Sequence, residues 1–260
     1  MSDLSLIQYA LIALVFVWSG FVRSGLAFGG AVLSLPFLLL IHNDPLVYLP
    51  IISVHLLIFS SLTIWMNHRK QTAQAEGGVV SGTVDWRYLL KILGIMIVPK
   101  IIGVFGLITL PALVMSSIIF VIVSVYALSY ILNKPFRSKS PFVDAVFLML
   151  GGYISGTSLI GAPLIIAVVA QHLPRERLRD TLFALWFILV TIKMGAFIWA
   201  GVDLQLIHHL WLLPCATVGH FIGLWFHERM LKSDPTVFFR FLGVVLLVVS
   251  SLGLWRGITG

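Results

Sequence analysis

The feature that most constrains the fold is a succession of long apolar segments that covers most of the chain. Hydrophobic residues make up 59% of the 260 residues and charged residues 10%, too few charges to give a soluble domain its polar surface. Several segments reach the roughly 18 residues with which a helix crosses a bilayer, and they lack the alternation of barrel strands. The sequence therefore predicts an all-α polytopic membrane protein. The apolar segments cover residues 4–22, 26–41, 46–66, 88–109, 112–132, 142–155, 159–173, 181–200, 207–226 and 236–256.

Two glycine-rich segments resemble each other and interrupt this pattern at corresponding places in the chain. Gly20, which opens segment 20–30, aligns with Gly152, which opens segment 152–162. Each segment separates two short apolar pieces where a membrane helix would otherwise be continuous. Paired broken helices in two related halves of a membrane protein indicate the substrate site of a transporter.

A second match supports an internal duplication. Segment 98–103 aligns with segment 218–223, so that Lys100 and His220 take equivalent positions. Chance similarity between glycine-containing apolar segments is the alternative interpretation. We expect two repeats, residues 1–132 and 133–260, because both matches agree with the distribution of charge.

The distribution of positive charge predicts that the two repeats have opposite orientations. Lys and Arg in short loops stay on the cytoplasmic side of a membrane. Each repeat then consists of a Gly-broken helical hairpin and three transmembrane helices, which is an inverted-topology repeat with both termini periplasmic. The loops with Lys or Arg are 67–91, 133–141, 174–179 and 227–235, and the turns without them are 42–45, 109–112 and 201–206.

The first glycine-rich segment carries the pattern Gly-x-x-x-Ser-Gly-x-x-Phe-Gly-Gly-x-x-x-x-x-Pro from Gly20 to Pro36. This pattern resembles the TauE/SafE sulfite exporter family, as do the second copy from Gly152 to Pro163 and the surroundings of Lys193. The resemblance covers essentially the whole chain. It implies a multi-pass permease of the bacterial inner membrane that carries a small sulfur-containing anion, either sulfite or an organosulfonate. Its partners would then be this anion and the lipid bilayer, and the sequence leaves a homodimer open.

Five cations or imidazoles in or beside the apolar segments are candidates for binding the anion. A charge at membrane depth is costly and is a functional hypothesis by default, which applies to Arg23 and Lys193. Lys100 and His220 could face one central cavity from opposite sides. His55 lies in the middle of segment 46–66. The alternative for each of them is a structural role, with the side chain bonded to backbone carbonyls, reaching the membrane surface or packed in the core.

Glycines and hydroxyl residues of the two broken segments complete the predicted substrate site. At a broken helix, free N–H groups and the positive end of the helix dipole can bind an anion. Close packing of helices against small residues is the alternative role. The residues expected to provide these donors are Ser24, Gly25, Gly29, Gly30, Ser155, Gly156, Thr157, Ser158 and Gly161.

The chemistry that the apolar segments lack narrows the function. Asp and Glu lie only in loops or at segment ends, which argues against a cation transporter and favours an anion as cargo. We expect no metal site, no cofactor, no catalytic residues and no binding of nucleic acid. Two alternatives remain: an intramembrane enzyme that acts on a lipid-linked phosphate, which needs a buried acid or base, and a passive anion channel.

Overall fold

The computed structural model describes residues 4–26, 30–74, 84–138, 140–230 and 236–259. This part of the chain is helical and contains no strand, which confirms the predicted fold class. The ten helices are α1 (Leu6–Leu26), α2 (Gly30–Ile41), α3 (Pro45–Gln74), α4 (Trp86–Thr109), α5 (Ala112–Ile131), α6 (Pro141–Ser158), α7 (Ala162–His172), α8 (Arg175–Trp199), α9 (Leu206–Met230) and α10 (Thr236–Thr259).

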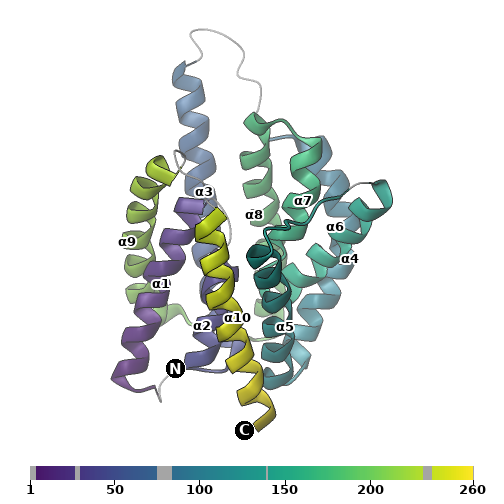
Figure 1. Ribbon diagram of the computed structural model, residues 1–260. Helices are drawn as coiled ribbons and strands as arrows, with labels where there is room; N and C mark the ends of the chain where they lie inside the picture. Colours follow the sequence, from purple (N-terminus) through teal and green to yellow (C-terminus); the bar gives the residue numbers. More distant parts are fainter. Residues whose placement is uncertain (1–3, 27–29, 75–83, 139, 231–235, 260) are drawn as a thin grey trace.

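Helices α1 and α2 form one helical hairpin, and α6 and α7 form another. A hydrogen bond joins the open ends of the first hairpin, where Gln8 Nε2 donates to the Ile41 carbonyl at 3.1 Å. An ion pair joins the open ends of the second, where His172 Nε2 lies 2.8 Å from Asp144 Oδ2. The α1–α2 hairpin opens toward the end of the molecule that holds the chain termini, and the α6–α7 hairpin opens toward the opposite end (Figure 1).

Each hairpin packs on a long helix from the other half of the chain. Helix α1 packs along α9, α6 packs along α4, and α3 meets α8 between the two hairpins. Glycines allow the close approach, because a Cβ atom on Gly20 would overlap the Ala216 carbonyl and one on Gly156 would overlap the Lys100 carbonyl. Small residues at helix contacts are typical of membrane proteins, in which packing takes over from the hydrophobic effect.

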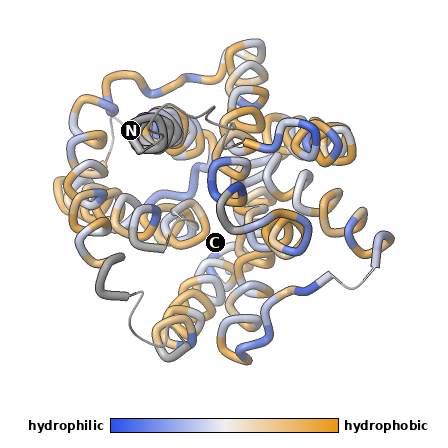
Figure 2. Tube along the Cα trace, turned by 90° about the horizontal axis from the view of Figure 1, so that it is seen from above, coloured by the Kyte–Doolittle hydropathy of each residue, from blue (hydrophilic) through white to orange (hydrophobic). Residues whose placement is uncertain are grey.

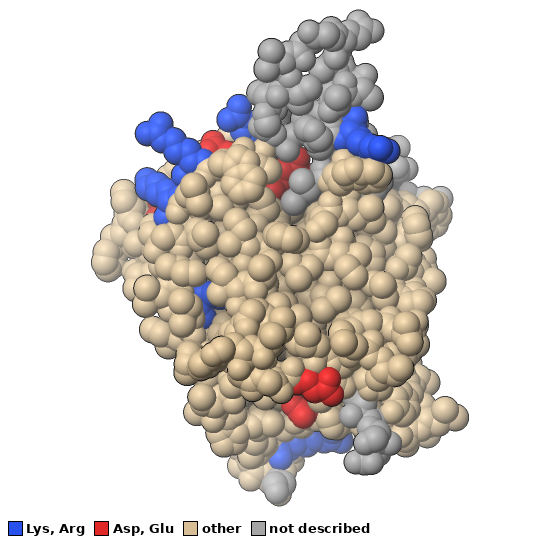
Figure 3. Space-filling model, turned by 180° about the vertical axis from the view of Figure 1, so that it is seen from behind, with Lys and Arg blue, Asp and Glu red and all other residues tan. Residues whose placement is uncertain are grey.

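The outer surface is apolar over the height of a membrane. Seven helices, α1, α3, α4, α5, α8, α9 and α10, are long and apolar enough to cross a bilayer. Large side chains such as those of Trp199 and Phe221 are exposed on this surface. Apolar residues lie on the outward sides of the helices as well as between them (Figure 2). On the face shown in Figure 3, a broad band almost free of charge separates two charged ends, and several Lys and Arg lie at the end opposite the termini.

Several helices extend beyond the expected apolar segments. Helix α3 continues to Gln74 and α4 begins at Trp86, so both ends of the expected loop at 67–91 are helical. Helix α8 begins at Arg175, so all but the first residue of the expected loop at 174–179 is helical. These helices reach past the apolar band, where polar side chains meet water and a helix needs no apolar sequence. Helix α1 runs to Leu26, four residues beyond its expected end, and is itself long enough to span a membrane.

Candidate functional site

The breaks in the two hairpins lie three to four residues later than the sequence suggested. Ser155, Gly156, Thr157 and Ser158 belong to the last turn of α6, and the chain turns at residues 159–161. Their N–H groups are therefore inside a helix, because the groups left free at a helix C-terminus are carbonyls. Within the described structure these four residues therefore offer no free backbone N–H, and their part in binding the substrate stays a prediction.

The end of α1 departs from the expectation in the same way. Arg23, Ser24 and Gly25 are helical residues of α1, which runs to Leu26. Gly29 lies outside the described residues. Gly30 and Gly161 stand at the starts of α2 and α7, where N–H groups without helical partners occur.

A left-handed residue makes the turn of the second hairpin. Leu159 has a φ of 62°, an uncommon value for a residue with a bulky side chain, and its N–H donates to the Ser155 carbonyl at 3.2 Å. A Cβ atom on Gly161 would overlap the Gly151 carbonyl. Only glycine therefore lets the start of α7 return so close to α6.

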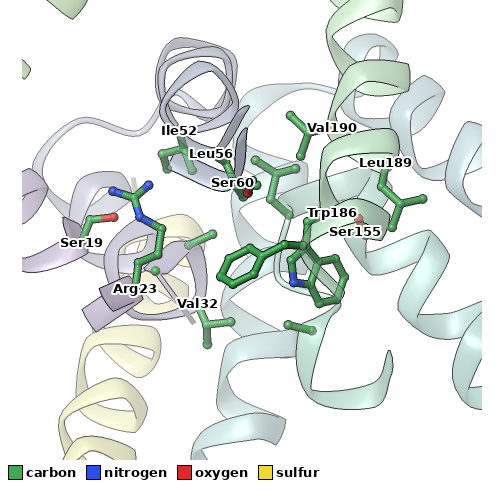
Figure 4. A pocket seen from close by; sticks show the side chains of 15 residues that line it. Ser19, Arg23, Val32, Ile52, Leu56, Ser60, Ser155, Trp186, Leu189 and Val190 are labelled. Carbon is green, nitrogen blue, oxygen red and sulfur yellow. The ribbon is translucent and has the colours of Figure 1, made fainter. Parts of the chain in front are cut away.

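A small, partly open cavity lies between the two hairpins, with α3 and α8 forming the rest of its lining. Its volume is about 60 Å³, and a buried water needs roughly 10–15 Å³ by the same kind of measure, so several waters or a small anion fit. Arg23 borders it from α1 and Ser155 from α6 (Figure 4). The lining residues are Ser19, Arg23, Gly30, Ala31, Val32, Ile52, Leu56, Ser60, Ser155, Leu159, Ala162, Phe183, Trp186, Leu189 and Val190.

Arg23 is the charged residue of this lining. Its guanidinium stacks on the Phe59 ring, with Cζ 4.0 Å from the ring centroid. The buried Nε and Nη2 atoms have no hydrogen-bond partner among the described residues. Among the described residues, the lining includes no Asp or Glu. A guanidinium presents several N–H donors in a rigid plane, which suits the oxygens of a small oxyanion.

Lys100 and His220 do not line this cavity, and each instead binds a serine of a hairpin helix. Lys100 is fully buried, and its Nζ donates to the Ser155 carbonyl at 2.9 Å and to Ser155 Oγ at 3.0 Å. His220 Nδ1 forms a short hydrogen bond with Ser24 Oγ. The two residues therefore hold opposite hairpins.

Lys193 and His55 are buried close to the cavity lining. Lys193 is 0% exposed, its Nζ has no hydrogen-bond partner in the described part of the chain, and it follows the lining residue Val190 by one turn of α8. His55 is 2% exposed and packs edge-on against the rings of Phe16 and His209. Lys193 is thus a second cation, after Arg23, without a hydrogen-bond partner in the parts of the chain that the structure describes, and His55 is packed in the core.

The hydroxyls of Thr157 and Ser158 point back along their own helix. Both donate to the Ile154 carbonyl, at 3.0 Å and 2.9 Å. Gly156 faces α4, because its Cα lies against Gly103. The structure thus brings Arg23, Gly30 and Ser155 together at the cavity and leaves these three residues out of it.

Three polar residues of the lining escaped the sequence analysis: Ser19, Ser60 and Trp186. Helical spacing would have indicated two of them, Ser19 and Trp186. Ser19 precedes Arg23 by four residues, so both lie on one face of α1. Trp186 and Lys193 are seven residues apart and share a face of α8, again by helical spacing. A search for polar residues at these spacings from the two buried cations would have found these two residues.

The comparison with family models identifies the chain. The model described as "Sulfite exporter TauE/SafE" matches residues 12–253, which is nearly the whole sequence. No curated protein and no solved structure matches the chain. Together with its seven apolar helices, this match makes the protein a multi-pass membrane transporter that takes a small anion. The chain belongs to the TauE/SafE sulfite exporter family.

Proposed function

We propose that the protein is a secondary permease for a small sulfur oxyanion, sulfite or an organosulfonate, and that the anion binds in the cavity between the two hairpins. The observation that carries this proposal is Arg23, whose Nε and Nη2 have no hydrogen-bond partner among the described residues and which borders a cavity whose described lining includes no carboxylate. A buried charge without a partner costs several kcal/mol, and an anion in the cavity would offset this cost. The unpaired ammonium of Lys193 adds a further positive charge nearby.

We also propose that the two halves, residues 1–132 and 133–260, form an inverted repeat whose relative rocking gives alternating access to the cavity. The pairing of contacts supports this proposal. Gly20 of α1 meets the Ala216 carbonyl of α9, and its sequence equivalent Gly152 of α6 meets the Met96 carbonyl of α4. The cavity has walls from both halves, so such a motion would expose it to either end.

Flux measurements with the purified protein in liposomes test the proposed function. We expect saturable uptake of sulfite or a C2 sulfonate that is accelerated by the same anion on the other side. Flux that does not saturate and shows no countertransport would instead identify a passive channel. Release of phosphate from a lipid-linked phosphate would identify an enzyme.

Cysteine labelling tests the proposed orientation in the bacterial inner membrane, with both termini periplasmic. Asn133 and Ala112 are exposed at opposite ends of α5. In a Cys215→Ser background, an impermeant thiol reagent outside the cell should label Ala112→Cys and leave Asn133→Cys unlabelled. The reverse pattern would invert the topology.

A further inference from the structure

Ser155 differs from several other hydroxyl residues of the long helices in the hydrogen bond that its side chain makes. A serine or threonine in a helix commonly donates its hydroxyl proton to the carbonyl four residues earlier. Several residues of this chain do so at 2.8 Å. They include Ser117 with Leu113, Ser124 with Phe120, Thr191 with Phe187 and Thr217 with Leu213.

The hydroxyl of Ser155 has no such bond. Its Oγ accepts a hydrogen bond from Lys100 Nζ at 3.0 Å, and an ammonium group has donors only. Within the described residues, the Ser155 hydroxyl makes no second hydrogen bond, so its proton remains available. Ser155 lines the cavity opposite Arg23 (Figure 4).

Lys100 is well suited to hold this arrangement. Its Nζ is fixed between two acceptors of one residue, the Ser155 carbonyl at 2.9 Å and the Ser155 Oγ at 3.0 Å. The side chain is fully buried, so water does not compete for these bonds. A cation that donates to a hydroxyl also polarises it and makes its proton a stronger donor.

We propose that Lys100 is a positioning residue for anion binding: it occupies the acceptor side of the Ser155 hydroxyl and leaves the proton to donate to an oxyanion in the cavity. Arg23 would supply charge and N–H donors from one wall, and Ser155 would supply an O–H donor from the other. Lys100 itself does not touch the anion. This inference rests on the proposed function and adds the means by which the second hairpin recognises an oxygen of the cargo.

A structural role for Lys100 makes a different prediction. Lysine side chains often bond to the last carbonyls of a helix, and Lys100 does this at the Ser155 carbonyl of α6. If this were its whole role, loss of Lys100 would destabilise the protein with or without the Ser155 hydroxyl. Measurements of stability alone therefore cannot distinguish the two roles, and the test has to follow the KM for the anion.

The test is a double-mutant cycle on the KM for sulfite in proteoliposomes. Lys100→Met and Ser155→Ala should each raise the KM about tenfold, the lower end expected for a hydrogen bond to a charged group. The KM of the double variant should be no higher than that of the more impaired single variant, because the two residues act through one proton. Ser155→Thr keeps the hydroxyl and should restore a KM close to that of the parent.

Ser124→Ala is the matched control, because this serine bonds to its own helix away from the cavity and should keep the parent's KM. The inference would be overturned if the KM increases of Lys100→Met and Ser155→Ala multiplied in the double variant. It would also be overturned if Ser155→Ala kept the parent's KM. If Lys100→Met does not fold, Lys100→Gln replaces it in the same test, together with Ser155→Ala and Ser155→Thr. A parent that neither binds nor transports sulfur oxyanions would instead refute the proposed function itself.

Discussion

The contact of α1 with α9 and the contact of α6 with α4 follow one plan but distribute their charges differently. In both, a polar residue of the long helix binds a serine of the hairpin helix: the half-buried His220 binds Ser24, and the buried Lys100 binds Ser155. The first contact keeps its cation, Arg23, on the cavity wall. In the second contact the cation, Lys100, binds Ser155 and does not line the cavity. The two walls of the cavity therefore offer unlike groups, a guanidinium on one side and a hydroxyl on the other.

The largest effect is expected at the wall that carries the charge. Arg23→Gln removes the cation and donors that an anion would use, so kcat/KM for sulfite should fall about 100-fold or more, as for the loss of two hydrogen bonds to a charged group. Arg23→Lys should retain part of the activity because it keeps the charge. Transport in proteoliposomes measures both. Arg177→Gln, on an exposed arginine, is the control, and equal activity of Arg23→Gln and the control would contradict the proposed site.

The helix contacts should differ in how much a methyl group disturbs them. A Cβ on Gly219 would overlap the Val17 carbonyl severely, whereas one on Gly152 would come within 2.7 Å of the Met96 carbonyl. Gly219→Ala should therefore lower the free energy of unfolding by about 1–3 kcal/mol and Gly152→Ala by less. Thermal unfolding in detergent measures this order. Gly94 has open space around it, so Gly94→Ala should match the parent; a stable Gly219→Ala variant would refute the close contact.

The two hydrogen-bonded pairs, His220 with Ser24 and Lys100 with Ser155, should differ in their influence on transport. His220→Leu removes the bond to Ser24, which does not line the cavity, so the KM for sulfite should rise only about threefold, within the range of one ordinary hydrogen bond. The effect expected for Lys100→Met is larger because Ser155 faces the cavity. Parallel transport assays compare them. If the KM rises as much or more in His220→Leu than in Lys100→Met, the contact of α1 with α9 matters for transport at least as much as the contact of α6 with α4.

The smallest effects are expected at the open ends of the hairpins. The Asp144–His172 pair is partly exposed, with side chains 19% and 46% accessible, and such pairs contribute roughly 0–1 kcal/mol. Asp144→Asn and Gln8→Ala should each change stability by less than about 1 kcal/mol and leave sulfite flux unchanged. A large loss of flux in either variant would mean that these ends take part in the transport cycle.

Much of the fold could be predicted from the sequence because the membrane leaves few options for an apolar chain. The apolar segments indicated the helices, and the glycine-rich segments indicated where two of them end. The ends themselves were misplaced, because Ser24 and Ser155 to Ser158 fit a helix end as well as a loop. Only the packing of Gly156 against α4 and the turn at Leu159 decide that α6 continues.

The site could be predicted only in part. Arg23 and Lys193 attract attention because a charge is conspicuous in an apolar helix. Ser60 and Trp186 carry no charge, and whether they face a cavity or lipid depends on how α3 and α8 pack. The pairing of Lys100 with Ser155 joins helices from different halves of the chain, and no local pattern encodes it.

The left-handed conformation of Leu159 bears on how the transporter could move. This conformation costs a residue with a side chain on the order of 1–2 kcal/mol, and here the leucine side chain forms part of the cavity wall. A turn whose costly conformation is held by the packing of the Leu159 side chain is poorly suited to act as a hinge. Opening the cavity would then have to carry α6 and α7 together as one stiff unit that slides against its neighbours.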